Sequence, residues 1–170
     1  MIQRAVWYLT PRSWRKPLHR YVKDVDTTFG SFIRGQILVS LCVGILSSIA
    51  LWIVGVPYAF LLGLFIGAAD MIPYFGAFIG SLPALITALL ESWKLALLTA
   101  LAIIIVQQIE GNILSPVIVG RTLQLHPLLI IFALLVGAEL GGIIGLLIAV
   151  PLLAIAKVTL IHIRLYLMKH

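Results

Sequence analysis

The residues best suited to chemistry in this chain lie in one short stretch, DMIPYFG, residues 70–76, between two apolar runs. Asp70 supplies a carboxyl group. Pro73 has no backbone N–H and disfavours helix at the residue before it, and Gly76 can adopt backbone angles closed to other residues. We therefore expect two half-helices to meet here, since a broken helix at membrane depth must face protein or water and often carries a transporter's ion or substrate site. A plain hairpin turn outside the bilayer explains the same residues, and the sequence leaves both interpretations open.

Charged residues are rare in the apolar part of the chain. Those between Arg34 and Arg164 are Asp70, Glu91, Lys94, Glu110, Arg121, Glu139 and Lys157. Glu91, Lys94 and Lys157 lie near expected helix ends and are interpreted as boundary residues in contact with water. A charge at the bilayer centre costs about 2.5–3.5 kcal/mol on insertion scales, so the other four should face a cavity, pair together or lie at a re-entrant tip. Among them, Asp70 and Glu139 are our candidates for cation or proton sites.

A polar stretch marked by Gly and Pro, residues 110–127, supplies further candidates. Glu110 and Arg121 bracket Gly111–Asn112 and Ser115–Pro116 and could pair across the loop. His126 is neutral or charged near neutral pH and could carry protons, although a single interfacial histidine is more often structural. The remaining candidates for lining a transport pathway are Tyr74, Gln107, Gln108 and Asn112.

Motifs for catalysis and metal binding are missing from the sequence. There is no HExxH, no Walker loop, no GxSxG elbow and no nucleophile beside a base. The single cysteine, Cys42, cannot form an internal disulfide or a Cys-based metal site, and is interpreted as a packing residue. We expect no metal, no cofactor and no enzymatic activity, with an intramembrane enzyme as the remaining exception.

The composition indicates a membrane protein. The 170 residues are 62% hydrophobic and 11% charged, against about 45–50% and about 25% in soluble domains. Ile37–Ala69 holds no charge at all, and about 20 apolar residues suffice to span a bilayer. The expected fold is all-α, polytopic and transmembrane, with broken or re-entrant helices and an N-terminal amphipathic interfacial helix.

The positive charge gathers at the start of the chain. The Lys and Arg residues before Ile37 are Arg4, Arg12, Arg15, Lys16, Arg20, Lys23 and Arg34. Because positive flanks stay cytoplasmic, we expect a cytoplasmic N-terminus, and Lys157, Arg164 and Lys169 suggest the same for the C-terminus. Nucleic-acid binding is the rival interpretation, which the spacing of these residues does not favour.

Three regions follow. Residues 1–36 form a cytoplasmic or interfacial segment, in which the apolar spacing of 18–33 predicts an amphipathic helix on the membrane surface or against a neighbouring helix. Residues 37–163 form a transmembrane permease domain, which begins with a span over 37–56. Residues 164–170 form a cytoplasmic tail.

The rest of the permease domain is divided by Gly, Pro and polar residues. Residues 59–69 and 76–90 are too short to cross alone, 95–109 form a further helix, and 110–127 are expected to be a loop. Residues 128–163 are too long for one straight span. We favour a hairpin that breaks near Gly141–Gly142 over a long bent helix.

Small residues recur at every fourth position in four of the apolar runs. They are Ser40, Gly44 and Ser48; Ala59, Gly63 and Gly67; Gly76, Gly80, Ala84 and Ala88; and Ala133, Gly137, Gly141, Gly145 and Ala149. Small side chains let helix backbones approach closely in lipid. The pattern predicts a tightly packed bundle, within the chain or between copies in a homo-oligomer.

Four segments together resemble a known family. They are RGQ before the first span, IPYFGAFIGSLPA, QQIEGNILSPVIVGRTLQLHP and GIIGLLIAVPLLAIAKV, and they cover most of residues 30–160. The chain resembles the C-terminal half of the autoinducer-2 exporter-like family of bacterial permeases, whose members are usually longer. The resemblance implies a multi-span inner-membrane protein that moves a small solute and is homo-oligomeric in some members. Some relatives export autoinducer-2, and others are similar to sodium (or lithium)/proton antiporters.

The leading hypothesis is therefore a bacterial inner-membrane permease or exporter. Its partners would be the lipid bilayer, a small solute and a monovalent cation or proton, with no nucleic acid. The alternatives are a membrane oligomerisation or scaffold module that transports nothing, and a passive channel.

Overall fold

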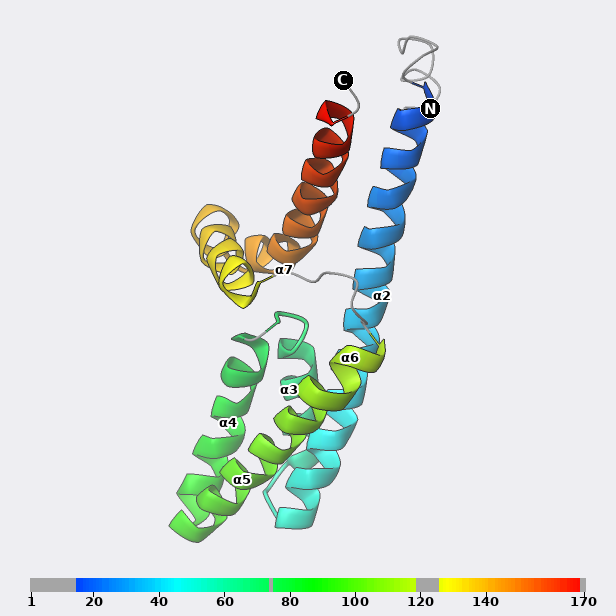
Figure 1. Ribbon diagram of the computed structural model, residues 1–170. Helices are drawn as coiled ribbons and strands as arrows, with labels where there is room; N and C mark the ends of the chain where they lie inside the picture. Colours follow the sequence, from blue (N-terminus) through cyan, green and yellow to red (C-terminus); the bar gives the residue numbers. More distant parts are fainter. Residues whose placement is uncertain (1–14, 74, 119–125, 169–170) are drawn as a thin grey trace.

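The computed structural model describes residues 15–73, 75–118 and 126–168, and these are helical apart from short turns (Figure 1). The predicted all-α fold is confirmed. In chain order the elements are α2 (Arg15–Val54), α3 (Ala59–Ala69), α4 (Phe75–Glu91), α5 (Trp93–Ile109), the π-helical turn η1 (Glu110–Leu114), α6 (Ser115–Ile118) and α7 (Pro127–Leu167).

The C-terminal half of α2 packs with α3, α4 and α5 into a four-helix unit, which fills the lower half of Figure 1. Its core holds Val43 and Leu51 from α2, Ile66 from α3, Ala84 from α4 and Val106 from α5. Here α2 and α4 run opposite to α3 and α5, and the connections are short. Gly55, at φ 86°, follows the end of α2, close to the predicted end of the first span at residue 56, and Ser92 caps the start of α5 by accepting a hydrogen bond from the Leu95 N–H at 3.1 Å.

Small residues hold this unit together. A Cβ placed on Gly67 would lie 2.6 Å from the Cα of Gly44, and one placed on Gly63 would collide with Ser48. A Cβ placed on Gly80 would lie 2.9 Å from the Cβ of Ala69. These predicted positions are therefore where helix backbones meet, as close packing in lipid requires.

Within the described residues, three helices are long and apolar enough to cross a membrane, by length and composition: Tyr21–Val54, Trp93–Ile118 and Leu128–Arg164. The helix predicted over residues 18–33 is the beginning of α2, which runs without a break into the predicted first span. Ala59–Ala69 and Phe75–Glu91 are shorter, as expected.

The last of these three helices is a hairpin. Gly142 has φ 56° and ψ −135°, which breaks α7 into two helices. The backbones of Gly137 and Gly145 touch where the two halves fold back on each other, so the predicted hairpin near Gly141–Gly142 is confirmed. Gly141 has open space around it and lies beside the break, outside the close contact. Pro151 lies within the second half and does not end it.

The prediction of a loop from residue 110 is wrong for residues 110–118. The helix continues from α5 through η1 into α6. Gly111 is tolerated in the wide π turn, in which Ser115 N–H donates to the Glu110 carbonyl oxygen. Pro116 follows directly after the change of register, where its missing N–H costs little.

A second apolar cluster joins α7 to α2 and to the α3–α4 turn. Its buried members are Phe32, Ile130, Leu134, Ala149 and Val150, and the partly buried residues packed against it include Ile33, Ile72 and Phe75. Because Ile72 belongs to the α3–α4 turn, the α7 hairpin rests on that turn, as its position above α3 and α4 in Figure 1 indicates.

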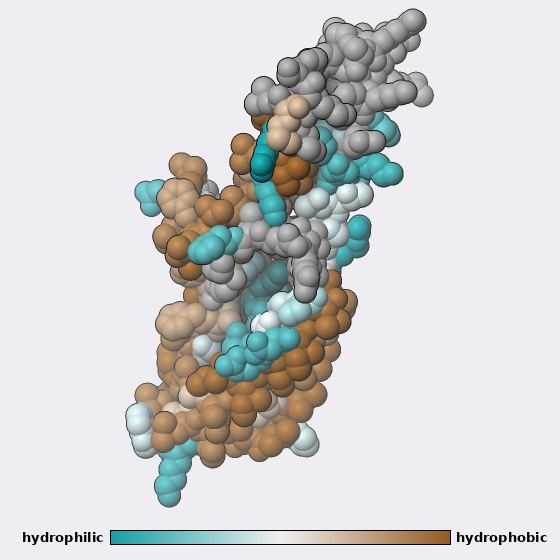
Figure 2. Space-filling view, viewed as in Figure 1, coloured by the Kyte–Doolittle hydropathy of each residue, from teal (hydrophilic) through white to brown (hydrophobic). Residues whose placement is uncertain are grey.

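The outer surface of the four-helix unit is mostly apolar (Figure 2). Trp52, Phe60 and Leu90 are between 71% and 84% exposed. Such a surface suits contact with lipid. A polar strip crosses it over α5 and η1, where Gln108 and Asn112 are exposed.

Candidate functional site

Asp70 is the most deeply buried acid in the described part of the chain. It directly follows α3, its N–H donates to the Ile66 carbonyl oxygen at 2.9 Å, and the residue is 2% exposed. Its Oδ2 has no hydrogen-bond partner among the described residues. A buried carboxylate without a partner is costly, so a proton, a cation or a donor must neutralise it.

The chain reverses direction in a tight turn after Asp70, and backbone hydrogen bonds hold this turn. Ile72 N–H donates to Ala69 O at 3.0 Å, and Gly76 N–H donates to Ile72 O at 2.8 Å. A Cβ on Gly76 would collide with the Ala69 carbonyl group, so only glycine lets α4 begin directly beside the end of α3. Two short helices meet in a tight turn at Pro73 and Gly76, which fits both a re-entrant break and a hairpin turn, and the depth of this turn in a bilayer stays a prediction.

Gln36 ties α2 to this break, and the sequence did not single it out. Its Nε2 donates to the backbone oxygen of Asp70 at 2.7 Å. It is the one amide side chain in α2, at the start of the apolar run, which is the signal that could have identified it. The contact fixes the last turn of α3 against α2, and so fixes the position of Asp70.

The end of α5 completes the cluster. Glu110, half-buried, opens the π turn η1, which packs against α2. One turn earlier, Nε2 of Gln107 is buried and has no partner in the part of the chain that the structure covers. Asp70, Gln36, Gln107 and Glu110 thus place two carboxyls and two amides at the end of the four-helix unit where α3 and α5 finish, and we call them the Asp70 cluster. Acceptors and spare donors together can bind a proton or cation and a small polar solute.

The cluster lies near one end of the apolar body. From Gln36 to Val54, α2 rises about 27 Å, and the hydrocarbon core is about 30 Å thick. The exposed aromatic residues Trp52, Tyr58 and Trp93 mark the opposite end, as interface residues do. With those residues at one membrane face, Asp70 comes close to the other face rather than to the midplane.

Three predicted pathway residues lie elsewhere in the structure. Asn112 Nδ2 donates to Gln108 Oε1 at 3.1 Å, and both side chains are exposed on the polar strip. His126 is exposed and its Nδ1 accepts a hydrogen bond from the Leu128 N–H at 3.3 Å, so it caps the start of α7. Capping a helix is a structural role, which is the more usual one for a single interfacial histidine.

Glu139 is exposed on the first half of α7, and no described contact joins it to Asp70. Tyr74 and Arg121 lie outside the described residues, so the expected pair of Glu110 and Arg121 stays a prediction. No group of three or more His, Cys, Asp or Glu residues that could hold a metal ion occurs in the segments 15–73, 75–118 and 126–168.

Apolar helices of spanning length, packed around a turn that buries an acidic residue, define the class of multi-pass helical membrane proteins. Residues 1–165 match the family described as AI-2E family transporter, and the chain belongs to that family. This is a transporter family, not an enzyme family, and the predicted family is confirmed.

Named relatives agree with this assignment. The chain is 49% identical over 162 residues to "Putative transport protein YrrI" of Bacillus subtilis, covering 95% of this chain and 46% of that protein. It is 38% identical over 155 residues to "Putative transport protein YueF" of the same organism, covering 91% and 42%. For a "Putative transport protein" of Thermotoga maritima the identity is 32% over 158 residues, covering 92% and 48%. The chain spans about half the length of the curated relatives it matches.

Proposed function

We propose that this chain moves a small polar solute across the bacterial inner membrane, and that the Asp70 cluster binds the coupling proton or monovalent cation. One observation carries the proposal: Asp70 is buried at a helix break, with a carboxylate oxygen that no described residue satisfies. In a transporter such a group is a functional site by default, because nothing structural offsets the cost of burying it.

The neighbouring acid supports coupling. Glu110 follows the end of α5 and Asp70 follows the end of α3, so both acids lie at the same end of the four-helix unit. Two like charges in a site of low dielectric cannot both stay unneutralised, so a proton or a cation shared between them stabilises the pair. Release of the proton or cation would leave the two like charges unneutralised. Their repulsion would then favour a conformational change, which couples the ion to transport.

The remaining polar groups suit a hydroxylated or carbonyl-bearing solute such as autoinducer-2. Gln107 Nε2 and the Ser40 hydroxyl are buried with unused hydrogen-bonding capacity in the described structure. A solute that satisfies them gains free energy that an apolar molecule cannot, because unmade buried hydrogen bonds are costly.

The charge distribution supports a cytoplasmic location for both termini and for the Asp70 end of the four-helix unit. Arg34 lies two residues before Gln36, and six further Lys or Arg residues precede it. The positive-inside rule then orients this end to the cytoplasm. Trp52 and Trp93 would lie at the periplasmic face.

The test is solute flux in proteoliposomes that contain the full chain, with an imposed proton or sodium gradient. Asp70→Asn keeps the shape of the side chain but removes its charge, and we expect gradient-driven uptake to fall by roughly tenfold or more, equal to about 1.4 kcal/mol. Glu91→Gln is the matched control, because Glu91 is an exposed acid at the far end of α4. Unchanged coupled uptake in Asp70→Asn would remove Asp70 from the mechanism.

The same assay separates the alternatives. Flux that ignores the ion gradient would indicate a passive channel. A discrete oligomer that moves no solute would indicate a scaffold. Gln108 and Asn112 support self-association, since their polar strip lies in an apolar surface and a second copy could cover it. Native mass spectrometry of the chain with Gln108→Leu and Asn112→Leu would report on that contact.

A further inference from the structure

Beyond the Asp70 cluster, the N-terminal half of α2 is fastened to the second half of α7. The hydroxyls of Tyr21 and Thr159 lie 2.7 Å apart and share a hydrogen bond. The ring of Tyr21 meets the ring of His162 edge to face, with centroids 5.4 Å apart and planes at 75°. Residues 138 positions apart in sequence are thereby joined at a partly exposed place. We call Tyr21, Asp24, Thr159 and His162 the clasp.

The geometry of His162 makes this clasp sensitive to protons. Its Nε2 lies 3.4 Å from Oδ2 of Asp24, and its Nδ1 lies 3.0 Å from the carbonyl oxygen of Val158. A carbonyl oxygen and an ionised carboxylate only accept hydrogen bonds, whereas a neutral imidazole has a single N–H. Both contacts are therefore complete only when both ring nitrogens carry protons.

The clasp and the Asp70 turn are joined by α7. Its second half leads from His162 back to Ala149 and Val150, which pack with Phe32. Its first half brings Leu134 into the same cluster, against which Ile72 packs. Ile72 is two residues from Asp70, so the hairpin covers the break.

We propose that the α7 hairpin is a cover over the Asp70 turn, and that the clasp holds it shut most firmly when His162 is doubly protonated. The consequence for transport rests on the proposed function of Asp70, but the cover and its clasp do not. A proton-dependent cover would let the acidity of the clasp's side of the membrane set access to the Asp70 cluster.

The charged and titratable groups near His162 come from α2 and from α7. From α2, Asp24 and Tyr21 face it directly. His19, Lys23 and Asp26 lie within about a turn and a half of Asp24 on α2, and Lys157 and Arg164 lie on the same half of α7 as His162. Asp24 is the acid in contact with the ring, and its side chain is 46% exposed, so the pair is open to solvent.

The clasp lies beyond the apolar body. The 40 residues of α2 extend about 60 Å, about twice the hydrocarbon thickness. With Gln36–Val54 crossing the bilayer, Tyr21 and Asp24 belong to the part of α2 outside it. His162 lies near the C-terminal end of the candidate span Leu128–Arg164 and its side chain is 25% exposed, so protons can reach it from that face of the membrane.

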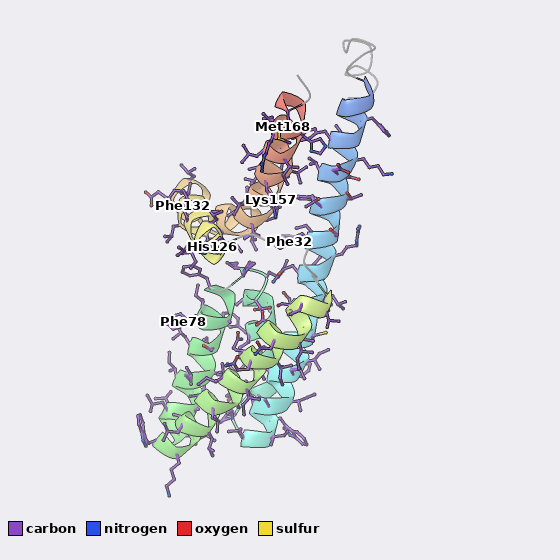
Figure 3. The ribbon with its side chains drawn as sticks, in the orientation of Figure 1. Phe32, Phe78, His126, Phe132, Lys157 and Met168 are labelled. Carbon is purple, nitrogen blue, oxygen red and sulfur yellow. The ribbon has the colours of Figure 1, made fainter. Side chains whose placement is uncertain are left out.

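The test is a distance measurement between α4 and α7 in the full chain in nanodiscs. Phe78 on α4 and Phe132 on α7 are 69% and 66% exposed and project on the same side of the molecule (Figure 3). Each is replaced by Cys in a Cys42→Ala background and spin-labelled. Distances are measured by double electron–electron resonance at about pH 5.5 and about pH 8.5, on both sides of the range in which histidines titrate.

We expect a single short distance at the lower pH. At the higher pH we expect a second population, longer by about 5 Å, the size of a one-turn displacement. Asp24→Ala should show the longer population at both values, and His162→Gln should lose the pH response. Asp26→Ala is the matched control, an exposed acid on the same helix, and should behave as the parent chain.

Identical distributions at both pH values in the parent chain would overturn the proposal, as would an Asp24→Ala variant with the parent's response. The measurement involves no transport. A negative result in the Asp70→Asn flux test would therefore not affect the proposed cover. A negative result in the distance measurement would not affect the proposed role of Asp70.

Discussion

The Asp70 cluster and the clasp are built from similar side chains in opposite surroundings. In the described residues of the four-helix unit, Ser40, Asp70, Thr99 and Gln107 each bury a polar atom that has no partner. In the clasp, Tyr21, Thr159 and His162 all have hydrogen-bond or ionic partners, and Asp24 remains about half exposed. Unsatisfied buried groups need a ligand, whereas satisfied surface groups fasten two helices.

The two regions also differ in how their helices meet. In the four-helix unit, glycine brings backbones into contact, as at Gly44 and Gly67. Between α2 and α7, side chains make the contact, with Phe32 against Ala149 and Val150 and the clasp beyond them. Direct backbone contact in the four-helix unit tolerates little displacement of the helices. The side-chain contacts between α2 and α7 can separate and form again. The predictions below test this contrast.

The largest effect should come from Gly67→Val. Its Cβ would lie 2.6 Å from the Cα of Gly44 and 2.7 Å from the Ser40 carbonyl oxygen, so α2 and α3 must separate. We expect a loss of about 3 kcal/mol or more in the free energy of unfolding. Unfolding in mixed micelles with increasing SDS, followed by tryptophan fluorescence, measures it.

The matched control is Gly111→Ala, a helical glycine with nothing within 4 Å of its Cβ position. It should leave stability unchanged or raise it slightly, because alanine favours helix. If both variants unfold alike, the backbones of α2 and α3 are not in contact in the membrane.

Next in size is the effect of Asp70→Asn on stability. Removing an unpaired buried charge relieves its desolvation, and we expect the protein to become more stable by about 1–3 kcal/mol while coupled flux is lost. Asp24→Asn in the clasp should change stability by less than about 1 kcal/mol, as half-exposed ion pairs do. A loss of stability in Asp70→Asn would mean that its carboxylate has a structural partner.

A smaller effect is expected from Gln36→Leu. It removes the 2.7 Å hydrogen bond to the Asp70 carbonyl oxygen and should cost about 1–2 kcal/mol in the same unfolding assay. Gln108→Leu is the comparison, because Gln108 is exposed, and should cost less than about 0.5 kcal/mol. Equal costs would remove Gln36 from the support of the α3 end.

The smallest effect should come from Thr159→Val, which deprives the Tyr21 hydroxyl of its partner. We expect a loss of about 0.5–1 kcal/mol. In a double-mutant cycle, Tyr21→Phe should add almost nothing once Thr159 is Val. Additive losses would contradict the bond that joins α2 to α7.

Local chemistry explains what the sequence could predict. The turn after Asp70, the end of α2 at Gly55 and the hairpin at Gly142 all occur at proline or glycine residues, which disfavour the continuation of a helix or permit a turn. The four stripes of small residues anticipated the contact of Gly44 with Gly67 and that of Gly137 with Gly145.

Long-range contacts and the change of helix register at the π turn could not be predicted from the sequence. Gln36 reaches Asp70 across 34 positions and Tyr21 reaches Thr159 across 138, and no local pattern encodes such pairs. The π turn at Glu110 was missed because Gly111 and Pro116 indicate a loop, whereas packing of α5 against α2 carries the helix through them.

The continuity of α2 has a mechanical consequence. One rigid rod carries Tyr21 near one end and Gln36 about 22 Å along it, so the two points cannot move independently. Tilting the rod by about 5° about Gln36 swings Tyr21 through about 2 Å, with no bend to absorb it. Through this rigid helix, a displacement at Tyr21 outside the bilayer would be transmitted to Gln36 and to the Asp70 carbonyl oxygen that Gln36 binds.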